Sequence, residues 1–319
     1  MDRRSFLAIG SVAAVTGATR AGGHDIGYPH EHLPDGAVVP TDQLLMRRIP
    51  ATGEMIPAIG LGTSGPFEVG ADESARAPLR EVLQAFFMAG ATLIDTSPMY
   101  STAESVLGDL LKPEQQAKVF LATKVWTPGS GNAAEQKGIE QMQRSIALLK
   151  HPRTELMQVH NLVDLDTHLK TLRRWKAEGK VKYIGVTHYT ESSYPDLIAI
   201  IEREKLDFVQ FNYSVVTRAA ERRLLPLCAD KGVAVIINRA FEDGNLFAKV
   251  QGKPLPPWAA EIGAKSWAQV FLKFVLSQPA VTCVIPATGK VRNLADNLGA
   301  ALGKLPDGKQ RAQIVAAVG

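Results

Sequence analysis

From about residue 43 onward, the chain alternates short apolar runs with longer amphipathic segments. The apolar runs are rich in Val, Ile and Leu, as is typical of strands that are buried on both faces. We expect eight such strands, at residues 59–61, 92–94, 119–123, 156–159, 184–186, 208–211, 233–237 and 281–285. The intervening segments have helical periodicity, with helices predicted at residues 77–89, 103–111, 134–149, 166–178, 192–203, 220–231, 266–277 and 291–302.

Eight strand–helix alternations favour a closed (β/α)8 barrel, a TIM barrel, over an open doubly wound sheet. A β-hairpin around Thr52 and Gly53 is expected before the first strand, and a helical extension at residues 305–318 after the last helix. This barrel domain would span residues 43–319 of the 319-residue chain. No Gly-x-Gly-x-x-Gly motif opens any of the helices, which argues against a Rossmann-type dehydrogenase.

Four chemically active side chains lie at or just beyond the ends of neighbouring predicted strands. Asp95 and Tyr100 occur in LIDTSPMY, Lys124 in VFLATKV, and His160 in LMQVHN. The carboxyl ends of parallel barrel strands meet on one face, where the active sites of this fold are built. Taken singly, each residue has an ordinary structural explanation as a turn cap, a surface lysine, a packed ring or a core histidine. Their shared position favours a joint catalytic role.

Together the four groups suit the protonation of a carbonyl oxygen during hydride transfer. Tyr100 is the expected general acid, although an ordinary tyrosine titrates near pH ~10. A nearby Lys124 ammonium would lower that pKa by stabilising the phenolate. Asp95 can hold Lys124 in place, and His160 can donate a hydrogen bond that orients the carbonyl group.

Several phrases of the chain resemble the aldo-keto reductase family over roughly residues 43 to 302. They are IPAIGLGT, IDTSPMY, AESVLGDLL, LATKV and the strand-end His160. The resemblance implies reduction of small aldehydes or ketones to alcohols, with NADP(H) as the cofactor and NAD(H) as an open alternative. The other class of function left open is a nicotinamide-binding sensor or accessory subunit with little turnover.

The same resemblance assigns residues to the nicotinamide end of the cofactor. Thr187 and His188 match a Ser-Asn pair that usually binds the nicotinamide amide, and Gln210 matches a further amide-binding position. Asn238 stands where most relatives carry a stacking tyrosine, and Arg239 where a serine is common. Arg239 can meet the pyrophosphate or serve as an ordinary surface ion-pair residue.

The segment IPATGKVRNLADN resembles the adenosine-phosphate segment of the family. There, Thr288 and Gly289 are expected near phosphate, Lys290 and Arg292 near a 2′-phosphate, and Asp296 and Asn297 near adenine. The usual arginine position is Asn293, one residue after Arg292, and one residue rotates a helical side chain by about 100°. Met99, Trp126 and Asn161 are the expected residues of the substrate wall.

The first residues are typical of an export signal. Asp2-Arg3-Arg4-Ser5-Phe6-Leu7 resembles a twin-arginine motif, and a short, mildly apolar stretch follows it. We expect a signal peptide at residues 1–21, a linker at residues 22–42, and export to the periplasm or beyond by the twin-arginine translocation machinery. The apolar stretch is too short for a stable membrane anchor. The alternative is a tail that contains the Arg-Arg pair by chance.

The amino-acid composition narrows the remaining classes of protein and of binding partner. A hydrophobic fraction of 45% and a charged fraction of 21% are ordinary for a soluble globular protein. The net charge of +4 is small and the chain has no dense basic run with interleaved aromatics, so no nucleic-acid partner is expected. Only Cys228 and Cys283 are present, which excludes a disulfide framework and favours buried, inert thiols. No metal site is predicted.

Overall fold

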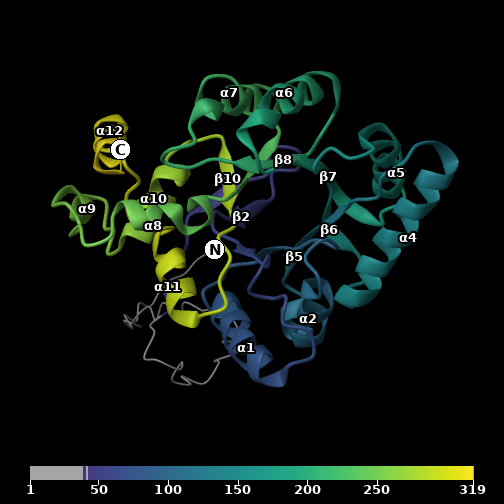
Figure 1. Cartoon of the computed structure of the whole chain (residues 1–319), viewed down its shortest axis with the longest axis horizontal. Helices are drawn as coiled ribbons and strands as arrows, with labels where there is room; N and C mark the ends of the chain where they lie inside the picture. Colours follow the sequence, from purple (N-terminus) through teal and green to yellow (C-terminus); the bar gives the residue numbers. More distant parts are fainter. Residues whose placement is uncertain (1–38, 41, 319) are drawn as a thin grey trace, which may run out of the picture. The chain divides into compact units, whose positions relative to one another are not determined.

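In the computed structural model, which describes residues 39–40 and 42–318, eight strands form one parallel sheet that curves into a barrel (Figure 1). Each strand pairs with the next one along the chain. The strands are β3 (Leu61–Gly62), β4 (Leu93–Asp95), β5 (Phe120–Val125), β6 (Thr154–His160), β7 (Val181–Thr187), β8 (Phe208–Asn212), β9 (Ala234–Asn238) and β10 (Val281–Val284). Parallel bridges from Ile59 to Val284 and from Gly62 to Ala287 join the last strand to the first.

Helices follow the strands and surround the barrel in Figure 1. The main ones are α1 (Glu73–Met88), α2 (Ala103–Leu110), α4 (Gly131–Leu149), α5 (Leu165–Ala177), α6 (Tyr194–Arg203), α7 (Leu224–Lys231), α10 (Trp267–Leu276) and α11 (Val291–Gly299). Short helices α3 (Pro113–Gln116), α8 (Asn245–Lys249) and α9 (Trp258–Glu261) lie in the connections, and α12 (Gly308–Val318) is the helical extension. The predicted barrel, with its hairpin and C-terminal helix, is confirmed.

Several helix boundaries differ from the prediction, and in two regions the local reason is clear. Helix α1 begins at Glu73, four residues earlier than expected, because the Asp72 side chain accepts hydrogen bonds from the backbone N–H groups of Ser74 and Ala75. Pro113 not only ends the preceding helix but also begins the short helix α3. Proline suits that position because the first turn needs no N–H donor there.

The amino-terminal end of the barrel is closed by apolar side chains. In the antiparallel hairpin of β1 (Met46–Arg48) and β2 (Met55–Pro57), Ile49, just after β1, and Ile56 of β2 join the cluster inside the barrel. The rings of Phe120, Tyr183 and Phe208 pack there with centroids 5.3 to 5.9 Å apart. A second, larger cluster fills the space between the strands and the helices. Both thiols are buried, as expected.

Strand alternation places the polar residues inside the opposite end of the barrel. Successive side chains of a strand point to opposite faces, so a residue two positions beyond an inward-facing apolar side chain also faces inward. Leu93 precedes Asp95 in this way, Ala122 precedes Lys124, Phe208 precedes Gln210, and Ile236 precedes Asn238. The apolar floor and the polar site above it are therefore consecutive layers of the same strands.

The predicted signal peptide, residues 1–21, lies outside the described residues, as does nearly all of the predicted linker. Among the described residues, no helix combines the length and the apolar character needed to span a membrane.

Candidate active site

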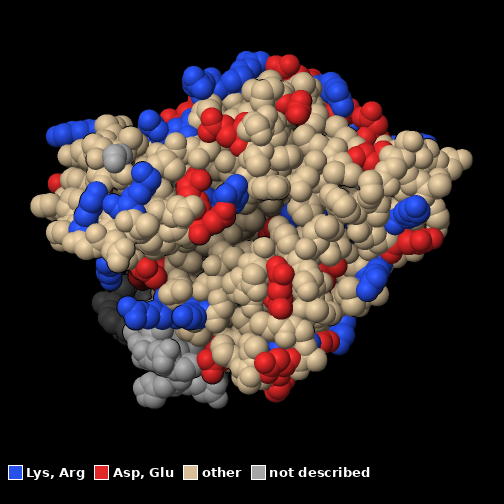
Figure 2. Space-filling model, viewed as in Figure 1, with Lys and Arg blue, Asp and Glu red and all other residues tan. Residues whose placement is uncertain are grey.

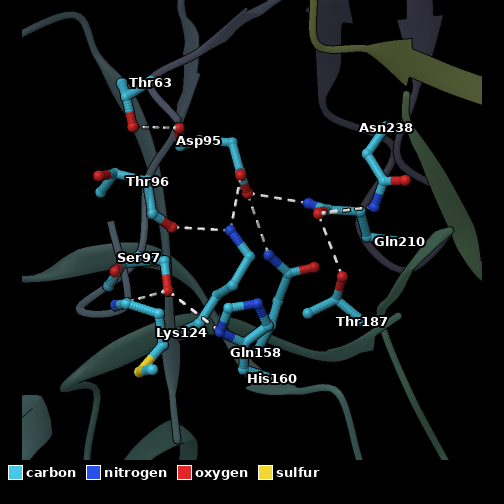
Figure 3. A network of polar contacts seen from close by, with 12 residues as sticks. Thr63, Asp95, Thr96, Ser97, Lys124, Gln158, His160, Thr187, Gln210 and Asn238 are labelled. Carbon is cyan, nitrogen blue, oxygen red and sulfur yellow. Dashed lines mark hydrogen bonds and ion pairs between the residues drawn. The ribbon is translucent and has the colours of Figure 1, made fainter. Parts of the chain in front are cut away.

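A buried ion pair lies at the centre of the polar layer (Figure 3). Lys124 Nζ is 2.6 Å from Asp95 Oδ2 and donates to the backbone oxygen of Thr96 at 2.7 Å. The amide groups of Gln158 and Gln210 donate to the other Asp95 oxygen at 3.3 and 2.9 Å. Burial, the largest single cause, lowers the pKa of Lys124, but its interactions with Asp95 and Tyr100 together outweigh burial, and the pKa is raised overall. Lys124 is therefore an ammonium group at the end of β5, and partners at the ends of β4, β6 and β8 hold the ion pair in place.

A buried glutamate fixes the strand that carries Lys124. Glu104 on α2 accepts hydrogen bonds from Thr123 Oγ1 at 2.6 Å and from Ser145 Oγ on α4 at 2.9 Å. Burial raises the pKa of Glu104 despite these donors. Glu104 therefore ties β5 to two helices immediately before the ion pair. Glu104 was not predicted from the sequence, because its partners are 19 and 41 residues away along the chain.

Tyr100 lies in the loop after β4, with its ring centroid 4.9 Å from Lys124 Nζ. Burial raises the pKa of Tyr100, Lys124 lowers it, and Asp95 raises it again, so the pKa is above the ordinary value. Lys124 thus lowers the pKa of Tyr100, as expected, but burial and the Asp95 charge together outweigh it. At neutral pH the phenol carries its proton.

His160 ends β6 and presents a neutral ring to the site. Burial, then Lys124, then His188 lower its pKa to about 3. The ring stands at 89° to that of Tyr100, with the centroids 6.1 Å apart. Its Nδ1 atom lies 3.1 Å from Ser97 Oγ, a contact that sequence reasoning missed. The imidazole can therefore act as a neutral hydrogen-bonding group beside the phenol.

A cavity of about 750 Å³ opens beside Tyr100 and His160. Its predicted lining residues are Tyr100, His160, Asn161, Thr187, Gln210, Asn238 and Arg239. Sequence reasoning missed Ser64, Pro66, Tyr189, Phe241 and Phe247, which also line it. These residues lie in the connections that follow β3, β7 and β9, where no strand alternation indicates which side chains turn inward. Figure 2 shows a hollow in the middle of this view, with acidic and basic side chains both near its edge.

Three predicted cofactor residues form one neutral cluster in the cavity wall. Thr187 Oγ1 and Asn238 Nδ2 both donate to Gln210 Oε1, at 3.1 and 3.3 Å, and Asn238 Nδ2 also donates to the backbone oxygen of His188 at 3.1 Å. The side-chain oxygens of Asn161 and Asn238 are buried without a partner among the described residues. Such oxygens are matched by the N–H groups of a carboxamide. The wall thus fits the nicotinamide end of a dinucleotide.

His188 is placed differently from the prediction. It does not line the cavity, and its Nδ1 atom accepts from the backbone N–H groups of Tyr189 and Thr190 at 3.0 and 3.3 Å. Its ring is stacked on that of Tyr189, at 5.4 Å and 9°. The ring thus stabilises its own loop, and an amide-binding role for its side chain has no support in this geometry.

Arg239 lines the cavity but is already paired. Its guanidinium group forms an ion pair with Asp243 and donates to the backbone oxygen of Tyr189 at 3.0 Å. The guanidinium carbon lies 5.7 Å from the centroid of the Tyr189 ring. Hydrogen bonding to Asp243 is the largest cause that raises the pKa of Arg239. The ion-pair interpretation is therefore confirmed, and a contact with pyrophosphate stays a prediction.

The predicted adenosine residues lie on and before α11, and only some of them share a cavity. Arg292 and Asp296 line a second cavity of about 780 Å³, together with Asn293 and the unpredicted Lys265. Ser266 Oγ donates to both oxygens of Asp296, at 2.9 and 2.7 Å. The remaining predicted residues, Thr288, Gly289, Lys290 and Asn297, line neither cavity. Asn297 is buried, and Lys290 is exposed at the start of α11.

The predicted substrate wall is not assembled as expected. Asn161 lines the cavity, but Met99 and Trp126 do not. Met99 is 45% exposed, and the backbone of Trp126 is bound to the Gln141 side chain by hydrogen bonds of 2.6 and 2.9 Å. A position near a strand end was thus insufficient to predict which loop residues turn toward the cavity.

Comparison with known proteins agrees with this architecture. The sequence model described as "Aldo/keto reductase family" matches residues 58–317. "Probable aldo-keto reductase 1" of Glycine max is 28% identical over 306 residues, covering 80% of this chain and 87% of that protein. An "NADH-specific methylglyoxal reductase" of Escherichia coli (strain K12) is 28% identical over 255 residues, covering 70% of this chain and 76% of that protein.

A solved structure is similar over most of the barrel. It is an aldo/keto reductase from Klebsiella pneumoniae in complex with NADP and acetate, with a TM-score of 0.70 and 24% sequence identity. The match covers 85% of this chain and 95% of that one. At this level of identity, the likeness shows a shared fold.

Proposed function

The chain belongs to the aldo/keto reductase family and is an NAD(P)H-dependent oxidoreductase, and from this premise we propose that it reduces small aldehydes or ketones with Tyr100 as the general acid. The observation that carries the proposal is the buried Lys124. Its ammonium group is 2.6 Å from Asp95 Oδ2 and 4.9 Å from the centroid of the Tyr100 ring. Tyr100 and His160 both line the cavity in which a carbonyl group would bind.

The reaction divides between the cofactor and the side chains. When bound against the cavity wall of Thr187, Gln210 and Asn238, a nicotinamide cofactor would supply the hydride that reduces the carbonyl carbon. As negative charge grows on the carbonyl oxygen, Tyr100 donates its proton to that oxygen, and Lys124 stabilises the resulting phenolate. His160, neutral at pH 7, donates a hydrogen bond to the same oxygen and orients the carbonyl group. The Asp95 carboxylate, held by two amide donors, keeps Lys124 in position throughout.

Small reactive aldehydes are the substrates that we propose to test first. The relative named as a methylglyoxal reductase supports this class. The cavity wall supports it too, since polar groups of Tyr100, His160 and Asn161 lie together with apolar Pro66 and Phe241. Methylglyoxal has one aldehyde and one ketone oxygen, so it can use more than one polar group of this wall.

The test of the proposal is Tyr100→Phe, which removes the hydroxyl group and keeps the ring. Because general acid catalysis typically contributes about 10²- to 10⁴-fold, we expect a loss of that order in the single-turnover rate of NADPH oxidation by methylglyoxal. Cofactor binding, followed by fluorescence, should be unchanged. A variant that reduces the aldehyde at the wild-type rate would refute the proposed role. A wild-type protein that binds the cofactor but does not turn over would instead support the sensor alternative.

We propose a preference for NADP(H) over NAD(H). Support comes from Lys265 and Arg292, which line the same cavity and form no ion pair with a carboxylate among the described residues. In titrations, NADPH should bind more tightly than NADH. Arg292→Ala should weaken the binding of NADPH alone, whereas Arg222→Ala, an exposed arginine that lines neither cavity, should change neither affinity. Equal affinities for both cofactors in the wild-type protein would count against the preference.

We also propose export by the twin-arginine route to the periplasm or beyond. The support is in the sequence: Arg3 and Arg4 precede Phe6 and a short apolar run. Replacing both arginines with lysine keeps the charge but alters the motif, and the precursor should then accumulate in the cytoplasm. Unchanged export of this double variant would contradict the twin-arginine assignment.

A further inference from the structure

Ser97 lies between Asp95 of the ion pair and the loop that carries Tyr100, and its side chain contacts His160 (Figure 3). Ser97 follows Asp95 by two residues and is buried, with 1% of its surface exposed. Its Oγ atom is 3.1 Å from His160 Nδ1 and accepts the backbone N–H of Met99, also at 3.1 Å. A buried hydroxyl group therefore joins the start of the Tyr100 loop to the ring at the end of β6.

The single proton and the lone pairs of the Ser97 hydroxyl group decide the direction of the Ser97–His160 hydrogen bond. A serine hydroxyl has one proton to donate and two lone pairs to accept with, and Met99 occupies one lone pair. Among the described residues, Ser97 Oγ has no hydrogen-bond partner other than Met99 and His160. If the hydroxyl donates to Nδ1, every group is satisfied. If Nδ1 carried the proton and donated instead, the buried hydroxyl proton would have no acceptor, which is unfavourable.

Because Nδ1 accepts a hydrogen bond from Ser97, the position of the ring proton is also determined. A neutral imidazole carries one proton, so an accepting Nδ1 places that proton on Nε2. Nε2 has no hydrogen-bond partner among the described residues, and His160 lines the cavity. A carbonyl oxygen has only lone pairs to offer. A ring with the proton on Nε2 can thus donate to it, whereas the other tautomer would present an unfavourable lone pair.

We propose that Ser97 is a positioning residue that holds His160 as the Nε2–H tautomer and fixes its ring plane, so that the ring donates to the substrate oxygen. The catalytic consequence rests on the proposed carbonyl reduction, but the position of the proton does not. In Ser97→Ala the ring loses its donor to Nδ1, so the proton is free to exchange between the two nitrogens. Ser97→Thr keeps a hydroxyl group at the same place.

The tautomer is measured directly by ¹⁵N NMR of histidine-labelled protein at pH 7, with His160→Gln used to assign the signals. In the wild-type protein we expect Nε2 to be protonated and Nδ1 to have the chemical shift of an unprotonated acceptor. Ser97→Ala should shift both signals toward an averaged state, and Ser97→Thr should restore them. A wild-type ring with its proton on Nδ1 would overturn the proposal, and this measurement needs no variant beyond the one used for assignment.

Kinetics separate positioning from a general structural effect. Ser97→Ala should lower kcat/KM for aldehyde reduction about tenfold, equivalent to about 1.4 kcal/mol, with NADPH affinity unchanged. In the His160→Gln background the same substitution should have no further effect. A tenfold loss that persists in that background would overturn the proposal. If the wild-type protein reduces no carbonyl compound, the proposed function fails, while the NMR result still decides the tautomer.

Discussion

Two halves of the same barrel end contribute to one cavity, and they differ in how their polar groups are satisfied. The half formed by β4, β5 and β6 contains a buried ion pair, and every oxygen of Asp95 has at least one donor. The half formed by β7, β8 and β9 contains neutral groups that bond to one another through Gln210 Oε1. Strand alternation brings both sets inward, so the difference lies in the side chains alone.

The ion pair is organised before any ligand binds, whereas part of the cavity wall is not. The side-chain oxygens of Asp95 are matched by the Lys124 ammonium and by two amide groups, one of them from β8, so the ion pair needs no ligand to be satisfied. In the cavity wall, Asn238 Oδ1 of the second half and Asn161 Oδ1, just after β6, are buried without a partner among the described residues. A buried unpaired oxygen costs free energy that a suitable donor restores. We therefore expect substitutions in the first half to affect folding and chemistry, and those in the second to affect ligand affinity.

The largest expected effect is that of Lys124→Met. It leaves the Asp95 carboxylate buried without its cation, and breaking such a pair typically costs about 3–5 kcal/mol. Chemical denaturation would measure the free energy of unfolding, and carbonyl reduction should also fall by at least two orders of magnitude because the phenolate loses its stabilising charge.

The matched control is Lys273→Met on α10. Lys273 is equally inaccessible to solvent, but its Nζ atom donates to the backbone oxygens of Leu302 and Lys304 and has no carboxylate partner among the described residues. Burial lowers its pKa to about 8, in contrast to the raised pKa of Lys124. Lys273→Met should therefore be less destabilising and leave the reaction unchanged. Equal destabilisation by the two variants would contradict a special role for the Asp95 pair.

A graded effect, smaller than that of Lys124→Met near neutral pH, is expected from His160 as the pH falls. Its folded-state pKa is about 3 and the ordinary value is 6.5, so between these values the unfolded chain binds the proton more readily. The contribution of His160 to the free energy of unfolding is therefore complete above pH 6.5. It is lost as the pH falls toward 3, by up to about 1.4 kcal/mol per pH unit. The difference in unfolding free energy between wild type and His160→Gln, measured at pH 7, 6, 5 and 4, should show this slope.

His188 provides the comparison from the other half of the barrel. Burial lowers its pKa, but Asp196 opposes the shift and the ring is only half-buried. His188→Gln should therefore change the pH dependence of the unfolding free energy less than His160→Gln does. If the two variants have the same pH dependence, the proposed contrast between the two halves is wrong for their histidines.

The smallest effect is expected from Asn238→Ala. It removes the donor to Gln210 Oε1 and the unpartnered oxygen, so NADPH affinity should fall about tenfold while stability changes by about 1 kcal/mol or less. Asn212→Ala is the control, because Asn212 is buried and its Oδ1 has no partner among the described residues, but it does not line the cavity. Calorimetric titration should show an unchanged affinity for the control. A large loss of stability in Asn238→Ala would contradict the comparison.

Much of the fold was predictable because its signals are local. Each strand is a short apolar run, and each helix has a periodic apolar face, so their number and order follow from the sequence. The position of Asp95, Lys124 and His160 at strand ends was likewise sufficient to place them on one face. Boundaries differed where a side chain such as Asp72 supplied a cap.

The residues of the connections after the strands were less predictable. Met99 and Trp126 were expected in the cavity wall and are not there, while Phe241 and Phe247, the latter in the short helix α8, are. Strand residues obey a fixed alternation, but a loop has no such period. Several residues that follow β9 adopt left-handed backbone angles, among them Arg239 and Asp243, with φ of 51° and 54°. Such local conformations redirect side chains in a way that hydrophobic patterning does not encode.

The sequence by itself determined the barrel, its family and the chemical identity of the four central groups, because these depend on residue type and on periodicity along the chain. Only the tertiary structure decided the electrostatics: the raised pKa of Tyr100, the neutral state of His160 and the pairing of Arg239 with Asp243. It also decided that Ser97 contacts His160, a residue 63 positions away. Hydrogen bonds and pKa values depend on distances and burial in space, which are fixed only when distant strands and their loops come together.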